Sequence, residues 1–320
     1  WPKGLFYRGE RPTFWCPNDE TPLAEADIEY EDRPARLVWM RFPLDGGGHI
    51  SIATTRPELL AACRAVIVHP NDDRFAAVHT KRATVPLYGR DVPIVAHAMA
   101  KPEFGSGAAM ICSYGDSVDL MLFRELRLDP VKAVDERGRM TEAAGELKGL
   151  KIEAARDKAI ELLRLHGALE KAEPLQHKTP ICSRCHTPIE FISSDAWYLK
   201  QLEFREELKK LAAAMEFRPP RHRQLLLDWI DSLTIDWPIS RRRYYHTEIP
   251  LWTCKTCGEV LAPPPGRYYR PWKDPAPFDA CPKCGGKTFV GEDRVLDTWM
   301  DSSCSNLFVT RDRTDKAFFD

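Results

Sequence analysis

The amino-acid sequence predicts an α/β protein in which a strand-rich α/β domain over residues 31–175 is followed by cysteine-rich segments that bind metal. Three observations support this fold class. Short β-type runs separated by turn-forming residues follow one another between residues 36 and 113, and apolar residues recur with a helical period over residues 151–166. Two CxxC motifs, at residues 254–257 and 281–284, predict a metal-bound knuckle in the C-terminal part.

The first strands are expected to form a hairpin over residues 36–55. The apolar runs at 37–42 and 49–53 flank the sequence Asp45–Gly48, which has a turn composition. Residues 1–30 are aromatic-rich and are expected to be irregular. Residues 88–91 have another turn composition. Further strand candidates are short β-type runs at 65–68, 83–87, 92–95 and 108–113.

Two helices are predicted inside this domain. One begins near Asp116 or Ser117 and runs through Leu126, and the other covers residues 151–166 with Gly167 as its C-terminal cap. Four segments follow the domain and show no internal repeat. They are a cysteine knuckle at 180–188, a helix near 200–215, a tryptophan- and arginine-rich segment at 225–252, and a second knuckle at 253–290.

The composition is typical of a globular protein with two or more domains. The chain has 320 residues, a net charge of −1, 43% hydrophobic and 29% charged residues. No apolar run reaches the roughly 18 residues that cross a bilayer, and no signal peptide is present, so we expect a cytoplasmic protein without a membrane partner. The chain begins at Trp1 without an initiator methionine and ends at Asp320, which is typical of a fragment.

Basic residues cluster at 218–223 and 241–243. From charge alone, a solvated face and a phosphate-contacting surface are equally good interpretations.

Four cysteines predict a structural Zn²⁺ site. Two CxxC turns, each followed by glycine, provide the four thiolates of a tetrahedral site, and four protein ligands leave no open position for catalysis. The alternative is a metal-free, reduced pair of turns. The four ligands would be Cys254, Cys257, Cys281 and Cys284.

A second metal site is predicted from residues far apart in the sequence. Cys182 and Cys185 form a third CxxC motif, and Cys16 and Asp19 have the same spacing with aspartate in the second position. Carboxylate is an accepted zinc ligand, so the four residues would join the two ends of an inserted domain. The alternative is an empty or degenerate site. The remaining cysteines, which are Cys63, Cys112 and Cys304, are interpreted as small buried hydrophobes.

Several phrases occur in a characteristic order. They include ATTRPE at 53–58, GSG at 105–107, GDSVD at 115–119, DWPISR at 236–241 and DTWMDSS at 297–303. Together they resemble the valyl-tRNA synthetase family, in its archaeal-type branch, over essentially the whole chain. The threonine-rich phrase is shared with isoleucyl and leucyl enzymes, whereas the last phrase favours valine.

The resemblance implies a domain organisation. Residues 31–175 would be an editing domain with a β-barrel core, inserted into a Rossmann-type catalytic domain. Residues 1–30 would lead into the insertion, 176–199 would be the return linker with its CxxC knuckle, and 200–320 would be the C-terminal part of the catalytic domain. The HIGH-type and KMSKS-type motifs do not occur, so ATP and Mg²⁺ belong to the intact ligase and this chain is not expected to activate valine.

The implied activity is hydrolytic proofreading of threonyl-tRNA(Val) within an enzyme that ligates valine to tRNA(Val). Threonine is almost isosteric with valine, and valyl-tRNA synthetase is itself the known example of this limit, with discrimination of about 10². The partners would be tRNA(Val) with its aminoacyl 3′ end and the threonine and valine esters, bound by a monomer. Two alternatives stay open: a non-catalytic, zinc-containing tRNA-binding module, and the editing domain of an isoleucyl or leucyl enzyme.

The resemblance also implies roles for individual residues. Asp119 matches the aspartate that binds the substrate α-ammonium, and Asp116 matches the acid proposed to contact the threonine hydroxyl. Without a Ser/His/Asp or Cys/His constellation, direct attack by water is expected. The alternative is that Asp116 or Ser117 caps a helix and Asp119 is an acid of its first turn.

Other residues would surround the substrate. Bacterial-type valine enzymes have Lys and Thr where this chain has Met110 and Cys112, so the polar contacts there are absent or replaced. His246 stands where the family usually has glycine. Thr54, Thr55 and Arg56 would form the loop around the terminal adenosine and the ester. Gly105, Ser106 and Gly107 would provide the backbone near the adenosine. Tyr245 and Trp299 would form the walls of the valine pocket, and core packing is the alternative for these two residues.

Overall fold

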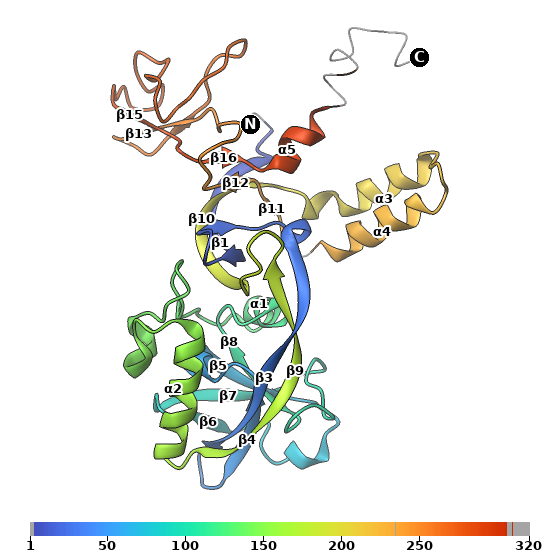
Figure 1. Ribbon diagram of the computed structural model, residues 1–320, viewed down its shortest axis with the longest axis vertical. Coiled ribbons are helices and arrows are strands. Elements are labelled where there is room, and N and C mark those ends of the chain that lie inside the picture. The colour runs from blue at the N-terminus through green and yellow to red at the C-terminus, as the bar shows by residue number, and fades with distance from the viewer. Residues whose placement is uncertain (1–2, 234, 306–308, 310–320) are drawn as a thin grey trace. The chain divides into compact units, whose positions relative to one another are not determined.

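The computed structural model describes residues 3–233, 235–305 and 309. Trp1 and Asp320, on which the expectation of a fragment rests, lie outside these residues. The chain divides into two compact units (Figure 1). One consists of Pro12–Ser193 and is called the 12–193 unit, and the other combines Trp1–Arg11 with Ser194–Asp320 and is called the second unit.

The 12–193 unit is built around two sheets. One has the strand order β4-β3-β9 and the other β6-β7-β5-β8, with β5 and β7 parallel and the other neighbours antiparallel. Each strand run predicted between residues 36 and 113 overlaps one of these strands. The strands are β3 (Ile28–Pro43), β4 (His49–Thr54), β5 (Cys63–Val68), β6 (Arg82–Val85), β7 (Arg90–Ala96), β8 (Ala108–Cys112) and β9 (Leu169–Cys182).

The turn between β6 and β7 lies two positions before the predicted one. It occupies residues 86–89 rather than 88–91. Arg90 and Asp91 cannot belong to the turn because they pair with Val85 and Thr84 in the antiparallel ladder.

β3 and β9 form a long antiparallel ribbon that extends beyond the predicted hairpin (Figure 1). Their ladder runs from Ile28 opposite Cys182 to Met40 opposite Leu169. The sequence analysis missed β9 because most of its side chains are exposed or half-buried, so it has no alternating apolar face. The strand is specified by backbone pairing with a partner that is distant in the sequence.

The expectation that residues 1–30 are irregular is wrong for the described part of that segment. β1 (Phe6–Cys16) and β2 (Thr21–Pro22) belong to a sheet with the order β11-β10-β1-β2. Aromatic contacts hold β1 to β10 (Glu190–Leu199), since the ring centroids of Phe6 and Trp197 are 5.0 Å apart and those of Phe14 and Phe191 are 4.8 Å apart. The aromatic residues that suggested an irregular segment therefore stabilise a strand.

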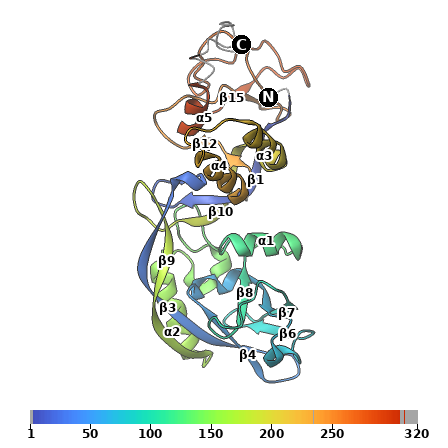
Figure 2. The ribbon, with the colours of Figure 1, turned by 90° about the vertical axis from the view of Figure 1, so that its right-hand side faces the viewer.

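The β6-β7-β5-β8 sheet packs helices on both faces. Val66 of β5 belongs to the main core together with Leu163 of α2, whereas the next residue, Ile67, packs with Leu122 of α1 on the opposite face. Figure 2 shows α1 beside β8. Both α-helices begin and end within one residue of the predicted positions. The helices of this unit are η1 (Glu25–Asp27), η2 (Pro57–Ala62), η3 (Asp73–Phe75), α1 (Ser117–Glu125), η4 (Glu142–Leu147) and α2 (Ile152–Leu165).

The second unit combines short strands with three α-helices in its described residues. The predicted helix near 200–215 corresponds to α3, whereas α4 was not predicted. No helix in the described residues is long and apolar enough to cross a lipid bilayer. The elements are η5 (Leu202–Phe204), α3 (Arg205–Ala214), α4 (His222–Ser232), β11 (Trp237–Pro238), β12 (Ser240–Arg241), β13 (Trp252–Cys254), β14 (Val260–Leu261), β15 (Phe289–Gly291), β16 (Val295–Leu296) and α5 (Thr298–Ser303). The protein is thus strand-rich α/β with several sheets, as the sequence predicts.

Candidate functional site

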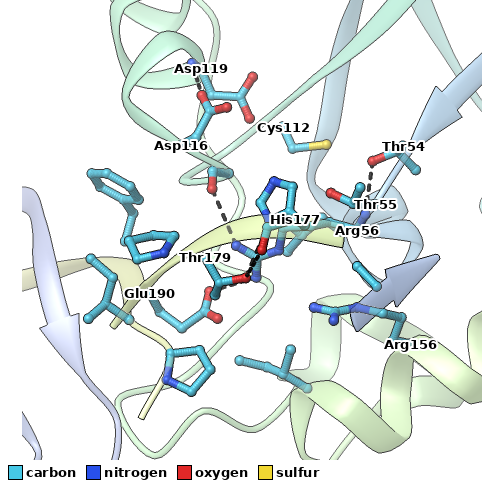
Figure 3. Close-up of a pocket in the computed structure, with 18 of the residues that line it drawn as sticks. Thr54, Thr55, Arg56, Cys112, Asp116, Asp119, Arg156, His177, Thr179 and Glu190 are labelled. Atoms are coloured by element: carbon cyan, nitrogen blue, oxygen red, sulfur yellow. Dashed lines mark hydrogen bonds and ion pairs between the residues drawn. The ribbon is translucent and has the colours of Figure 1, made fainter. Parts of the chain in front are cut away.

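The 12–193 unit contains a cavity of about 750 Å³, a volume within the range of small-molecule sites. Residues of β4, η2, β8, α1, α2, β9 and β10 line it. The structure brings together six of the predicted site residues in its wall (Figure 3). They are Thr54, Thr55, Arg56, Cys112, Asp116 and Asp119.

Asp116 is the N-cap of α1. Its Oδ1 accepts a hydrogen bond of 2.8 Å from the backbone N–H of Asp119. The capping interpretation therefore holds for Asp116, and it uses one of the two carboxylate oxygens. Because Asp116 also lines the cavity, the cap does not exclude a contact between its side chain and a ligand.

Asp119 is a buried carboxyl group in the cavity wall, with 8% of the residue exposed. Burial and the neighbouring charge of Asp116 raise its pKa well above the ordinary value, against a backbone hydrogen bond from Cys112 and the positive charge of Arg56. Such a group is costly to ionise without a cation beside it. The site thus favours a positively charged ligand group at Asp119.

Gly115 makes room for this carboxyl group. A Cβ atom at position 115 would lie 1.9 Å from Oδ2 of Asp119. Any other residue at this position would displace the Asp119 side chain. Steric space therefore explains why the GDSVD phrase begins with glycine.

Arg56 is the centre of a buried ion-pair network. Its Nη2 lies 2.6 Å from Oε2 of Glu190, and its Nε lies 3.1 Å from Oε1 of Glu58. Its Nη1 donates to the backbone oxygen of Gly115 at 3.3 Å. Burial lowers the pKa of Arg56, but the charges of Glu190 and Glu58 outweigh it and hold the pKa above its ordinary value. The guanidinium group is therefore bound largely by the protein itself.

A second arginine completes the network. Arg156 of α2 contacts Glu58 through Nη2 at 2.9 Å and through Nε at 3.1 Å, and Glu58 is completely buried. Two arginines and two glutamates thus balance their charges beside the cavity.

The sequence analysis missed four cavity residues, which are Arg156, His177, Thr179 and Glu190, and it also missed Glu58, which pairs with Arg56 and Arg156 beside the cavity. Glu58 ends the ATTRPE phrase, so the opposite charge two residues after Arg56 was the available signal. His177, Thr179 and Glu190 lie in the segment 176–199 that was interpreted as a linker. Nothing in their local sequence indicates a cavity.

The GSG loop has a packing role in the structure. Gly105, Ser106 and Gly107 are all described and are not among the residues that line the cavity. Gly105 has a φ of +60°, and a Cβ there would lie 2.6 Å from Cβ of Ala53. The loop therefore approaches β4 directly before Thr54, which does line the cavity.

Tyr245 and Trp299 belong to the second unit and are exposed by 82% and 54%. Within the described residues, neither side chain packs in a core. His246, which replaces the usual glycine, has Nδ1 at 2.7 Å from Oδ2 of Asp301 in α5.

The four predicted zinc ligands of the second unit lie together and are called the Cys254 cluster: Cys254, Cys257, Cys281 and Cys284. The Sγ atoms of Cys254 and Cys284 are 3.7 Å apart, as are those of Cys257 and Cys281. Sulfur atoms around a tetrahedral Zn²⁺ are about 3.8 Å apart, so the donor set fits zinc. A backbone hydrogen bond from Cys257 lowers the pKa of Cys254 to about 6, which favours the thiolate form that a metal binds.

The structure also assembles the long-range set, called the Cys16 cluster: Cys16, Asp19, Cys182 and Cys185. The Sγ atoms of Cys16 and Cys185 are 3.4 Å apart, and Oδ2 of Asp19 lies 3.7 Å from Sγ of Cys182. Three thiols and one carboxylate whose ligand atoms all lie within 4.8 Å of one another fit a single zinc ion. Cys63 and Cys112 are buried as predicted, whereas the prediction for Cys304 is wrong, because Cys304 is exposed at the end of α5.

Replacing Cys254 by serine is expected to remove one zinc ion per chain and to lower the melting temperature, because binding of a structural metal contributes directly to folding. Elemental analysis and thermal unfolding would measure both effects. The matched control is Cys304→Ser, which changes an exposed cysteine outside both clusters and should keep the full zinc content. A protein that folds fully without any bound zinc would contradict the prediction.

Comparison with known proteins identifies the family. A family model described as tRNA synthetases class I (I, L, M and V) matches residues 1–317. The chain belongs to the class I tRNA synthetases. It is 49% identical to valine–tRNA ligase of Aeropyrum pernix, covering 100% of this chain and 39% of that protein. For valine–tRNA ligase of Nanoarchaeum equitans the identity is 50%, covering 97% of this chain and 41% of that protein. The chain thus spans about two fifths of the length of these relatives.

Two tryptophan phrases of this class I synthetase chain meet inside the second unit. Arg241 of the DWPISR phrase and Asp297 of the DTWMDSS phrase form a fully buried ion pair. Trp237 donates from Nε1 to Oδ2 of Asp297 at 2.9 Å. Phrases separated in the sequence therefore contribute to one buried polar cluster.

Proposed function

We propose that this chain is the proofreading part of a valine–tRNA ligase and that its cavity hydrolyses threonine esterified to tRNA(Val). The observation that carries the proposal is the buried Asp119 carboxyl group in the wall of a cavity that the Thr54–Arg56 loop also lines. The intact enzyme would ligate valine to tRNA(Val) with ATP and Mg²⁺. The proposed location is the cytoplasm, and the proposed state is a monomer.

Asp119 would bind the α-ammonium group of the aminoacyl ester. A cation at this position relieves the unfavourable ionisation of the buried carboxyl group, so binding and charge compensation occur together. The oxygen of Asp116 that does not cap α1 would accept a hydrogen bond from the threonine hydroxyl. Valine has no hydroxyl, so its binding would leave a polar group unpaired, which is costly in a buried site.

Water would attack the ester carbonyl carbon directly. The bond between this carbon and the ribose oxygen then breaks, and threonine and free tRNA are released. Cys112 also lines the cavity, but burial raises the pKa of its thiol well above the ordinary value, and a neutral thiol is a poor nucleophile. This supports hydrolysis without a covalent acyl-enzyme.

The proposed domain organisation follows the family. The editing domain would cover 31–175 with a β-barrel core, between a leading segment at 1–30 and a return linker at 176–199. An isolated bridge between Leu44 and Ala83 links the end of β3 to β6, which supports closure of the two sheets into a barrel. Residues 200–320 would belong to a Rossmann-type catalytic domain, with Tyr245 and Trp299 at the valine pocket and Zn²⁺ as structural cofactor.

The test is deacylation of threonyl-tRNA(Val) by the 320-residue chain, with valyl-tRNA(Val) as the matched substrate. We expect the threonyl ester to be hydrolysed about 10⁴-fold faster than the valyl ester, the scale on which a site that binds a hydroxyl rejects a ligand without one. The same preparation should show no valine-dependent pyrophosphate exchange, because no ATP-binding phrase occurs in the chain. Equal rates on both esters, or no hydrolysis of either, would overturn the proposal.

A further inference from the structure

The Cys16 cluster contributes to the wall of the cavity through the chain around its ligands. Pro17 and Asn18, which lie between Cys16 and Asp19, line the cavity. Thr187 and Pro188, which follow Cys185, line it as well. Each of the two turns that provide metal ligands is therefore continuous with a part of the cavity wall.

The second of these turns determines where Glu190 lies. The segment from Cys182 to Pro188 forms the turn between β9 and β10, and an isolated antiparallel bridge joins Ile181 to Pro188. The N–H of His186 donates to the backbone oxygen of Cys182 at 2.9 Å, and the N–H of Ile189 donates to Pro180 at 3.1 Å. Glu190 directly follows Ile189, which donates the second of these hydrogen bonds. A change in the turn therefore moves the start of β10.

A series of short contacts leads from Glu190 to Asp119. Glu190 binds Arg56 at 2.6 Å, and Arg56 donates to the backbone oxygen of Gly115 at 3.3 Å. Gly115 directly precedes the N-cap of α1, and its Cα faces the Asp119 carboxyl group. Figure 3 shows Glu190, Arg56 and the start of α1 in this arrangement. All of these residues belong to the 12–193 unit.

In the described part of the chain, the two ligand turns contact each other through the side chains of the Cys16 cluster. Arg184 lies 2.6 Å from Asp27, and the backbone N–H of Ser183 donates to Asp27 at 3.0 Å. These contacts hold the turn of β9 and β10 to the start of β3. The loop of Pro17 and Asn18 is the turn between β1 and β2, in which Cys16 pairs with Thr21, and the closest side-chain neighbours of Cys16 and Asp19 across the cluster are thiols. Thiols are weak hydrogen-bond partners, so a shared metal ion would be the strongest link between this turn and the turn that contains Cys182 and Cys185.

We infer that the metal bound by the Cys16 cluster positions the cavity for ester hydrolysis, through Glu190 and Arg56, and that Asp19 makes this metal easier to remove than that of the Cys254 cluster. The inference rests on the proposed function of the cavity. Carboxylate is a harder ligand than thiolate, so a site with three cysteines and one aspartate holds zinc less tightly than a site with four cysteines. Asp19, Glu190 and Arg56 are thus positioning residues.

The experiment removes zinc from the 320-residue chain with increasing chelator concentrations. We expect one zinc ion to leave first, with faster amide hydrogen exchange over residues 113–120 and a loss of threonyl-tRNA hydrolysis on the order of tenfold, the scale of residues that orient a site. Asp19→Ala should lose the same zinc ion without chelator and reproduce both effects. Asp19→Cys should retain this zinc ion at chelator concentrations that remove it from the parent protein.

Two controls separate this effect from general unfolding. Asp32→Ala changes an exposed residue of the same β3–β9 ribbon and should leave zinc content and exchange unchanged. Glu190→Gln should break the ion pair between Glu190 and Arg56, so that removing the first zinc ion no longer changes hydrogen exchange over residues 113–120.

Loss of zinc from Asp19→Ala with unchanged exchange over 113–120 would overturn the inference, and so would full zinc retention in that variant. Hydrogen exchange needs no substrate. A parent chain that hydrolyses nothing would therefore refute the proposed function, while exchange would still decide whether the metal positions the cavity.

Discussion

Asp119→Asn is expected to abolish hydrolysis of threonyl-tRNA(Val) and to raise the melting temperature at pH 7. The activity should fall because asparagine carries no charge for the α-ammonium group. Loss of a buried charge partner corresponds to a decrease of about 10² or more in kcat/KM. The melting temperature should rise because the substitution removes a carboxyl group that is ionised at a cost in the folded protein.

The pH dependence of this stabilisation follows from the raised pKa of Asp119. The folded protein binds the proton more tightly than the unfolded chain. As the pH rises above the ordinary carboxyl pKa, the unfolded chain releases its proton first and the folded state becomes relatively less stable. The penalty is complete only above the folded pKa. The difference in melting temperature between Asp119→Asn and the parent should therefore disappear in acid and grow towards neutral pH.

Thermal unfolding and threonyl-tRNA deacylation of the same preparations measure both effects. Asp129→Asn is a matched control, because it makes the same chemical change at an exposed residue just beyond α1. Asp116→Asn is a second control that keeps most of the capping ability. An Asp119→Asn protein that hydrolyses threonyl-tRNA at the parent rate would show that Asp119 does not bind the ammonium group.

Local sequence predicted those elements whose apolar residues form a run or a regular period. The run of β5 could be recognised because both of its faces are buried, and β7 and α2 could be recognised because each has one face in a core. β9 could not be recognised in this way, since its polar residues pair with β3 far away in the chain. A strand that depends on backbone pairing leaves little trace in its own side-chain pattern.

The same distinction applies to the candidate site. Asp116 and Asp119 could be placed by a phrase that resembles a family, although local rules alone favoured a helix cap. The Cys16 cluster could be predicted because the two-residue spacing occurs twice. Glu190 had no comparable signal, because its role depends on its own burial beside Arg56. Burial of one charge decides the role of the other, and burial is a property of the tertiary structure.

Glu58→Gln is expected to destabilise the 12–193 unit by several kcal/mol, since breaking one buried ion pair typically costs about 3–5 kcal/mol. Glu58 is completely buried and receives hydrogen bonds from Arg56 at 3.1 Å and from Arg156 at 2.9 Å and 3.1 Å. Glutamine has nearly the same size but carries no charge and presents an amide donor to two guanidinium groups. Glu190 alone would then balance the positive charges of the two arginines in the network.

Urea unfolding of the parent and the variant measures this loss, and its pH dependence provides a further check. Arg56 and Arg156 outweigh the burial of Glu58 and lower its pKa, so the stabilisation by Glu58 is present above the ordinary carboxyl pKa and is lost as the pH falls through the folded pKa. The difference between parent and variant should therefore shrink in acid, as it does for Asp119→Asn, although Glu58→Gln is destabilising at neutral pH whereas Asp119→Asn is stabilising.

Two further variants identify uncompensated charge as the cause. Glu161→Gln removes an exposed glutamate of α2 that pairs with Lys158 and should change stability by no more than about 0.5 kcal/mol. The double variant Glu58→Gln with Arg156→Met removes one charge of each sign, so it should be more stable than Glu58→Gln alone. If the double variant is instead the less stable of the two, the effect of Glu58 comes from packing rather than from charge balance.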